Sequence, residues 1–394
     1  MAEAVEQIVN RKSPLCDRHA RLGGIMIERD GWQVPSSYGD VLLEYAAVRE
    51  GSAGLIDLSP RGRILVSGTE AIQFLNGLIT NDMKTLEVNT WMPAAFPNVQ
   101  GRLIASVRVV RLQDEGTGKN VFPTFLLDTE AATHQSVLKT IERFTLAGDF
   151  RVTDITNQTA LISVQGRKAA SVVRAVLGDA ASELDGNAAR QWHVHAARDD
   201  HGRDARATSE YGELTAINAS HAGEDRFDLI VNSNHAAGMW AALQDAGARP
   251  VGYEALEILR IEGGQPRYGV DMDEFNVVTE ALDDAVSYTK GCYIGQEIIA
   301  RIRYRGHVAK KLTGIVFPQA AKVEAGAVIK SADDKEIGRV TSAVYSPHLG
   351  RRVALAYLKY DYLAPETSVI VTSGDEKVPG KVAELPFVKG SPGQ

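Results

Sequence analysis

Two spacings of hydrophobic residues alternate along the first part of the chain. Apolar residues at helical spacing predict helices over residues 40–50, 70–79 and 131–144. Apolar residues that alternate or run together predict strands over residues 63–66, 102–111, 122–127 and 150–155. The polar turn at 114–118 would join the second and third of these strands as a hairpin. This order of strand, helix, strand, strand, helix and strand indicates a ferredoxin-like α+β unit.

A second stretch repeats the same kind of pattern. Its strands are predicted at 161–164 and 227–231, and its helices at 167–177 and 235–246. Between them, residues 197–212 are polar and charged and are expected to form an exposed loop. The sequence therefore predicts two α+β units in succession.

From residue 312 onward the pattern changes to short strands separated by Gly, Pro, Asp and Ser turns. The predicted strands are 313–317, 338–345, 352–357, 368–371 and 381–385. Several short strands at such spacing favour a small β-barrel or sandwich at the C-terminal end.

Length and composition narrow the class of protein. A chain of 394 residues with 44% hydrophobic residues is expected to fold into two or three domains. Its net charge of −7 leaves no excess of positive charge for nucleic-acid phosphates, and it contains no uninterrupted apolar run long enough to span a membrane. The two cysteines, Cys16 and Cys292, make neither a disulfide framework nor a metal-binding cluster. With no secretory signal evident, the expected compartment is the cytoplasm.

The segment KGCYIGQE, residues 290–297, carries the most specific chemistry. Two glycines flank Cys292 on a turn, and a helix is expected to begin near Gln296. The unpaired N–H groups of that helix, together with Lys290 and the arginines that follow, would lower the pKa of the thiol. The alternative is that Cys292 is a small buried residue at a tight packing point.

This segment resembles the signature octapeptide of the YgfZ-type folate-binding proteins, and residues 301–306 resemble its continuation. The wider resemblance, to the superfamily of the glycine-cleavage T-protein, covers nearly the whole chain. It is carried by residues 31–38, 48–59, 68–82, 162–166, 259–272 and 340–356. The resemblance implies an α+β fold: a three-domain ring of two ferredoxin-like units and a small C-terminal β-barrel, with tetrahydrofolate in a central channel.

The implied domains are a discontinuous first unit (1–50 and 155–280), an inserted unit (51–154), the signature loop and helix (281–311) and the barrel (312–394).

The same resemblance assigns roles to individual residues. Glu224 would contact the pterin, because a carboxylate can accept paired hydrogen bonds from its amino group and ring N–H. The alternative for Glu224 is an exposed turn carboxylate. Arg260 would hold a carboxylate or carbonyl of folate, or else pair with Glu257 or Glu262 in the interior. Tyr268 would stack on a ring of folate, or else be an ordinary core aromatic.

The remaining candidates lie in and after the signature. Gln296 would order the loop beside the folate, and Lys290 would keep the thiol of Cys292 ionised. Arg301 opens the densest basic stretch of the chain, which continues to Lys311. This stretch is either a solvated face or a docking strip for the glutamate tail of folate, which can be polyglutamylated. Nucleic-acid binding is not favoured, since Tyr304 is the one aromatic residue interleaved with the charges.

One segment departs from the T-protein pattern. Working aminomethyltransferases, as a family, carry an Asp pair after a glycine turn in the first β unit, where Ala105 and Ser106 stand in this chain. Neither residue can hold a proton as a carboxylate does, and no Asp or Glu occurs between residues 98 and 113.

The leading expectation is therefore a tetrahydrofolate-binding, YgfZ-like accessory factor in iron–sulfur cluster assembly or repair. Its partners would be iron–sulfur proteins or assembly factors, and Cys292 and Lys290 would form its reactive centre. The chain itself would hold no cluster, because two cysteines cannot supply four ligands. The alternatives are a folate-dependent aminomethyltransferase or demethylase, and a binding module that only senses folate.

Overall fold

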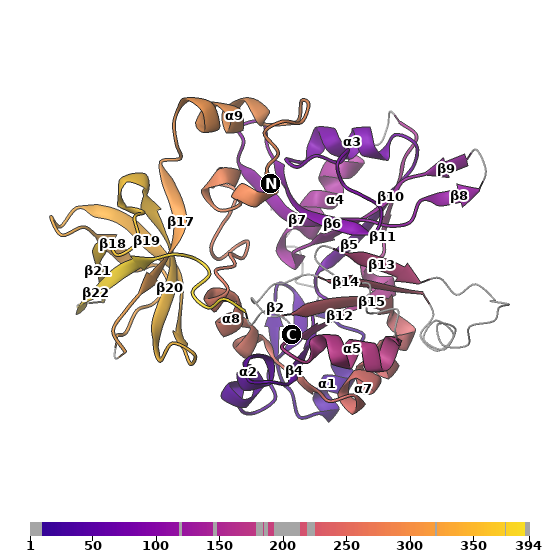
Figure 1. Ribbon diagram of the computed structural model, residues 1–394, viewed down its shortest axis with the longest axis horizontal. Coiled ribbons are helices and arrows are strands. Elements are labelled where there is room, and N and C mark those ends of the chain that lie inside the picture. Colours follow the sequence, from indigo (N-terminus) through magenta and orange to yellow (C-terminus); the bar gives the residue numbers. More distant parts are fainter. Residues whose placement is uncertain are drawn as a thin grey trace, which may run out of the picture.

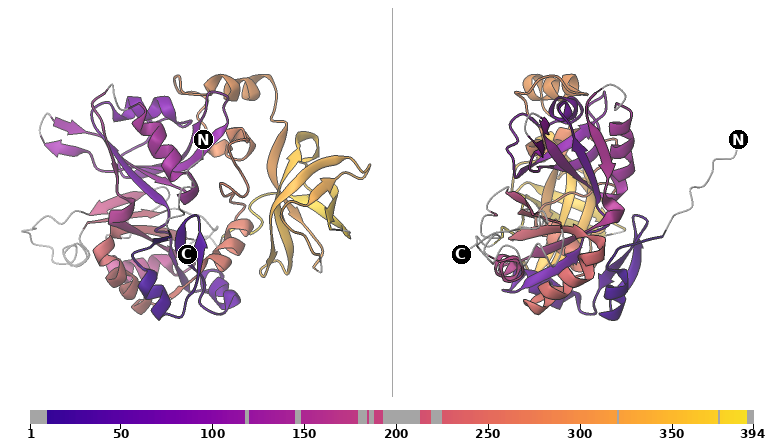
Figure 2. Two further views of the ribbon diagram at one scale, coloured as in Figure 1. Left: turned by 180° about the vertical axis from the view of Figure 1, so that it is seen from behind. Right: turned by 90° about the vertical axis from the view of Figure 1, so that its right-hand side faces the viewer.

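The computed structural model describes residues 10–117, 120–144, 148–178, 184, 188–192, 213–218, 225–319, 321–374 and 376–390. Within these residues the chain forms two sheet-containing α+β parts and a closed barrel. Figure 1 shows the three parts set around a common centre, with the barrel beside both α+β parts. The same arrangement is seen from behind in Figure 2. The α+β class and the C-terminal barrel expected from the sequence are confirmed.

The first α+β part is built on a six-stranded sheet of order β13–β14–β15–β12–β4–β16. Helices α5 (Ala169–Leu177) and α7 (Ala236–Asp245) bury apolar residues, among them Val173 and Trp240, against one face of this sheet. The other face carries Leu161 and Ile230 and packs against residues of the second sheet. The strands are β4 (Ala53–Asp57), β12 (Thr159–Gln165), β13 (Ala189–Trp192), β14 (Leu214–Asn218), β15 (Arg226–Asn232) and β16 (Ala248–Pro250).

The second α+β part is a five-stranded antiparallel sheet of order β11–β5–β10–β7–β6. Helices α3 (Ala71–Leu78) and α4 (His134–Glu142) pack against the face that carries Ala105, Val107 and Val109. The strands are β5 (Gly62–Ser67), β6 (Thr90–Pro97), β7 (Leu103–Arg111), β10 (Thr124–Thr129) and β11 (Arg151–Asp154), and β8 (Glu115–Thr117) and β9 (Asn120–Phe122) form a separate ribbon. Since β7 alternates, Ser106 and Arg108 face the other way, toward the six-stranded sheet.

A small N-terminal sheet, which the sequence did not predict, packs on the first part. It contains β1 (Arg11–Lys12), β2 (Ile25–Arg29) and β3 (Trp32–Ser37), and α1 (Cys16–Arg21) precedes β2. The fully buried His19 lies 2.9 Å from Oδ2 of Asp57 and so ties α1 to β4.

The predicted elements differ from the observed ones mainly at their ends. The expected helix at 40–50 is α2 (Val41–Arg49), and the expected helix at 131–144 is a turn of 3-10 helix followed by α4. Strand β4, which falls in the predicted inserted unit 51–154, pairs with β12 and so lies in the sheet of the first part. The other domain boundaries stay predictions. The expected loop at 197–212 lies outside the described residues.

The C-terminal barrel closes in the order β17–β20–β19–β18–β21–β22, so no strand edge is left open. Its interior is apolar, with Ile315, Ile329 and Leu358 fully buried. The strands are β17 (Lys310–Val316), β18 (Val328–Lys330), β19 (Glu336–Ser346), β20 (Arg351–Lys359), β21 (Ser368–Ser373) and β22 (Glu376–Ala383).

Helix α8 (Tyr253–Glu262) joins the first α+β part to the barrel. Near its end the buried Glu262 accepts hydrogen bonds from Arg49 (2.9 Å) and Tyr45 (2.9 Å) of α2 and from Ser346 of β19. Because these partners belong to two parts of the molecule, the carboxylate fixes the barrel against the first part. In the portion of the chain that the structure describes, no helix has the length and apolar character needed to cross a bilayer.

Candidate functional site

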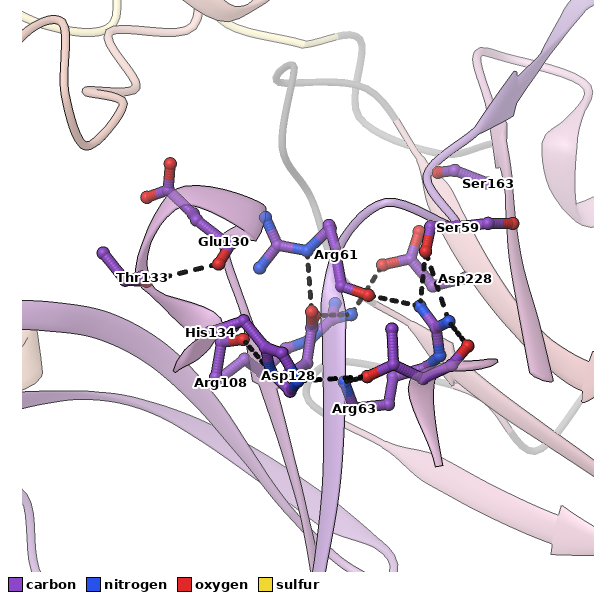
Figure 3. A network of polar contacts seen from close by, with 12 residues as sticks. Ser59, Arg61, Arg63, Arg108, Asp128, Glu130, Thr133, His134, Ser163 and Asp228 are labelled. Atoms are coloured by element: carbon purple, nitrogen blue, oxygen red, sulfur yellow. Dashed lines mark hydrogen bonds and ion pairs between the residues drawn. The ribbon is translucent and has the colours of Figure 1, made fainter. Parts of the chain in front are cut away.

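A buried network of charged side chains lies where the two sheets face each other (Figure 3). Arg108 of β7 and Asp128 of β10 are cross-strand partners in the five-stranded sheet, and Asp228 of β15 comes from the six-stranded sheet. All three side chains are at most 5% exposed. The alternation of β7 and β10 turns these charged positions away from the apolar core under α3 and α4 and toward the opposite sheet.

Arg108 connects the two sheets directly. Its Nη2 donates to Oδ2 of Asp128 (2.6 Å) and to Oδ2 of Asp228 (2.7 Å). Arg61 donates through Nε to the other oxygen of Asp128 (2.7 Å), and Arg226 donates through Nε to Asp228 (2.7 Å). Paired charges of this kind compensate each other in the interior, where a single charge would be costly.

The arginines keep both aspartates ionised. Burial alone would raise the pKa of Asp228, but Arg226 and Arg108 hold that pKa well below its usual range. Burial likewise opposes ionisation of Asp128, and Arg61 and Arg108 lower its pKa. Burial lowers the pKa of Arg226 to about 10, so its guanidinium is still charged at neutral pH.

Three N–H donor atoms in the described part of the network lack a hydrogen-bond acceptor. Nε and Nη1 of Arg108 and Nη1 of Arg226 are buried without a hydrogen-bond partner. A buried donor left unpaired costs on the order of 1–3 kcal/mol, so such atoms are uncommon in a structural network.

Two groups at the edge of this network stay partly accessible. The side chain of Arg61 is 21% exposed, and Glu130, the residue after β10, is half-buried. Figure 3 shows both side chains projecting to the same side of the network. Burial raises the pKa of Glu130, with Arg61 and the backbone N–H of Tyr268 (3.0 Å) opposing the rise. We call Arg61, Glu130, Arg108, Asp128 and Asp228 the central polar site.

The signature segment docks on the second α+β part. The ammonium of Lys290 is buried and donates to the carbonyl oxygens of Asn76 (2.8 Å), Ile79 (2.8 Å) and Asn81 (2.7 Å) at the end of α3. Burial lowers the pKa of Lys290 to about 8, against the effect of Asp82. These bonds commit the ammonium to the helix end, where a cation is favourable. Its predicted role toward the thiol therefore stays a prediction.

Cys292 is exposed, whereas Cys16 is half-buried, and burial raises the pKa of Cys16. The alternative that Cys292 is a buried packing residue is wrong. Helix α9 (Gln296–Arg305) begins four residues after Cys292. The reactivity of the thiol stays a prediction.

Two further sequence-predicted residues, Arg260 and Tyr268, lie at least half-buried in the interior. Arg260 is an interior ion-pair residue that bonds Glu257 (2.8 Å), Asp271 (2.7 Å) and Ser342 (2.8 Å), which matches the structural alternative; Glu262 bonds Arg49 instead. Tyr268 is half-buried at the edge of an apolar cluster, and its backbone contacts Glu130.

Gln296 begins α9 and is half-buried. Arg301 is 60% exposed and pairs with the exposed Glu297 (2.9 Å). Later cations of the basic stretch are also engaged: Lys311 pairs with Asp283, and Arg303 lies over the ring of Tyr288. Glu224 lies outside the described residues, so its predicted contact with the pterin stays a prediction.

No motif in the sequence pointed to the central polar site. The available signal was a charge inside an apolar strand: Arg108 interrupts β7, and Asp128 ends the apolar run of β10. A cavity of about 620 Å³ lies elsewhere, against the barrel, and is lined mainly by apolar surface that includes Phe317 and Pro379. It lacks the grouped charges of the central polar site.

Comparisons with known proteins agree with this arrangement. Residues 15–290 match the GCVT N-terminal domain, and residues 310–389 match the Glycine cleavage T-protein C-terminal barrel domain. The chain belongs to the glycine cleavage T-protein family. An aminomethyltransferase of Thermus thermophilus is 32% identical over 96% of this chain and 99% of its own length. One from Shouchella clausii is 29% identical over 96% of this chain and 98% of its own.

The T-protein fold is also shared in three dimensions. The crystal structure of glycine cleavage system aminomethyltransferase T from Bartonella henselae aligns over 96% of this chain and 98% of its own with a TM-score of 0.82 at 22% identity. The names of these T-protein relatives favour the folate-dependent transferase over the YgfZ-type accessory role, which the matches do not support.

Proposed function

We propose that this protein binds tetrahydrofolate at the central polar site and transfers a one-carbon group, aminomethyl or methyl, to or from it. The observation that carries the proposal is the match of both T-protein domains across nearly the whole chain. The named relatives of similar length are aminomethyltransferases.

The residues of the centre suit such a ligand. A pterin presents N–H donors, and Glu130, at the partly accessible edge of the site, would accept from them. Arg61 would face a carbonyl or carboxylate, and Tyr268 and Glu224 would complete the contacts. When bound, tetrahydrofolate supplies the amine that carries the one-carbon unit.

Ala105 and Ser106 stand where the T-protein pattern has an acid pair. Ala105 is buried in the core under α3, whereas Ser106 lies on the face of β7 that meets the centre. A transferase with serine at this place needs another group to hold the proton that a carboxylate would take.

The exposed thiol of Cys292 favours a second candidate function. In this candidate the protein is a folate-dependent accessory factor for iron–sulfur proteins, with Cys292 as its reactive group. It predicts that Cys292→Ala abolishes function in cells, whereas a transferase of the proposed kind keeps its turnover in that variant.

The test is calorimetric titration with tetrahydrofolate in mono- and polyglutamylated forms. The proteins are the wild type, Glu224→Ala, Cys292→Ala and, as a distant charge control, Glu366→Ala in the barrel. We expect binding that weakens at least about tenfold in Glu224→Ala, the loss of a charge-assisted pair, and is unchanged in the other two variants. Tighter binding of the polyglutamylated form, reduced by Arg301→Ala, would support the docking strip. Absence of binding to the wild type overturns the proposal.

A further inference from the structure

The position of Glu130 follows from strand register. In the antiparallel pair of β7 and β10, Asp128 lies opposite Arg108, and Thr129 lies opposite Val107. The ladder ends at Thr129, but Glu130 keeps an extended backbone, so the register continued by one residue would set it beside Ser106 on the face that looks toward the centre. Cross-strand neighbours have Cβ atoms about 4.5–5.5 Å apart.

Glu130 differs from the other acids of the central polar site. Asp128 and Asp228 are each bound to two arginines, which hold them ionised. Glu130 instead receives the backbone N–H of Tyr268, and the side-chain charges that act on it are Arg61 and Arg260 on one side and Asp30 on the other. Because burial outweighs these cations, its pKa is raised, and proton exchange becomes accessible nearer to neutral pH.

We infer that Glu130 is the proton-transferring carboxylate of this site, supplied by the residue that follows β10 at the place where β7 offers only Ser106. The inference rests on the proposed function. It assigns to this chain a way of handling the proton that does not need an acid on β7.

The step balances without an oxidant or reductant. A secondary amine R₂N–H receives carbon from a donor C–X: the N–C bond forms, the C–X bond breaks and its electron pair leaves with X. The electron pair of the N–H bond stays on nitrogen, while an Oε atom of Glu130 takes the proton and returns it to X, which departs as X–H. Arg61 limits the cost of the carboxylate, and the N–H of Tyr268 orients it.

Two measurements test whether Glu130 transfers the proton. The first is calorimetric titration with tetrahydrofolate in buffers of different ionisation enthalpy, which counts protons exchanged on binding. The second is the single-turnover rate of one-carbon transfer to tetrahydrofolate from an aminomethylated carrier protein of a glycine cleavage system, in which the step above forms the first N–C bond. The variants are Glu130→Gln, Glu130→Asp, Glu130→Gln with Ser106→Asp, and Glu366→Gln as the control.

We expect Glu130→Gln to bind tetrahydrofolate with an affinity within about tenfold of the wild type, since the amide keeps an acceptor oxygen. It should lose the pH-dependent proton exchange and slow transfer by about 10²–10⁴-fold. Ser106→Asp in the same chain should recover at least about tenfold of the rate, because it returns a carboxylate to the neighbouring strand. Glu366→Gln should behave as the wild type.

Folding can be checked separately. A carboxyl with a raised pKa binds a proton more readily in the folded chain, so its contribution to stability falls as pH rises from the unfolded pKa through the folded pKa. Glu130→Gln should therefore melt no lower than the wild type at pH 8, and Glu130→Asp offers a second folded variant that keeps the exchange.

The outcomes separate the two proposals. If the wild type does not bind tetrahydrofolate, the proposed function fails and the role of Glu130 fails with it. If the wild type binds while Glu130→Gln keeps its proton exchange, the inference about Glu130 alone is overturned. Binding without measurable transfer, but with proton exchange that depends on Glu130, supports the assignment.

Discussion

At the scale of single residues, the same residue type serves different ends according to its burial and partners. Arg301 is exposed and pairs with an exposed glutamate, an arrangement worth little, whereas Arg108 is buried and links two sheets through two aspartates. Lys290 lies two residues from Cys292 in sequence, but its ammonium is bound to three backbone carbonyls. Proximity in the sequence suggested that Lys290 keeps the thiol of Cys292 ionised, but the hydrogen bonds of its ammonium do not support that role.

Replacing Lys290 by Met should destabilise the protein by about 3 kcal/mol, because three buried carbonyl oxygens lose their donor. The measurement is urea unfolding at pH 7, below the pKa of about 8, where the ammonium is mostly protonated. Lys311→Met, which removes an exposed ion pair with Asp283, is the matched control and should change stability by less than about 1 kcal/mol. Equal effects of the two changes would contradict a docking role for Lys290.

At the scale of elements, the signature segment acts as a connector that positions α9 on the second α+β part. Gly295 precedes α9 with φ +78°, and a Cβ there would lie 2.4 Å from the carbonyl oxygen of Asn98. Glycine is required at this position both by the left-handed conformation and by the close approach of the turn at 98–101. The segment 290–297, which suggested a reactive loop, therefore also needs glycine at position 295 for close packing.

Gly295→Ala should therefore destabilise the protein by about 2–4 kcal/mol, through backbone strain and the clash with Asn98. Gly291→Ala is the control within the same segment, because a Cβ there meets nothing within 4 Å. Thermal unfolding of both variants measures the difference, and hydrogen exchange should show faster exchange in α9 for Gly295→Ala alone. A stable Gly295→Ala with unchanged exchange would disprove the packing requirement.

At the scale of the whole molecule, apolar clusters and buried charged contacts together join the three parts. The two sheets meet through Arg108 and its aspartates, and the barrel meets the first part through Glu262 and Arg260 at the end of α8. Charged contacts have stricter geometric demands than apolar surfaces, so they favour one orientation of the parts. The central polar site exists only in that orientation, since its residues come from both sheets.

Glu262→Gln should weaken the attachment of the barrel. The change removes the charge that compensates Arg49, which is expected to cost about 3 kcal/mol. Limited proteolysis should then cleave the connection between α9 and β17 faster than in the wild type, while Glu366→Gln, a surface change in the barrel, should not alter the rate. Unchanged cleavage in Glu262→Gln would show that apolar contacts suffice to hold the barrel.

The amino-acid sequence alone predicts the α+β class, the C-terminal barrel and most helices and strands, and it carries the T-protein resemblance. Each of these depends on a local pattern, such as the alternating side chains of β7, the helical spacing of apolar residues in α3 and the motif that contains Gly295. The tertiary structure was needed to show that β4 joins the first sheet and that Glu130 accepts the backbone N–H of Tyr268. It also decided that Arg108 meets Asp228, 120 residues away. These contacts depend on strand register and on the meeting of two sheets, and no local pattern specifies either.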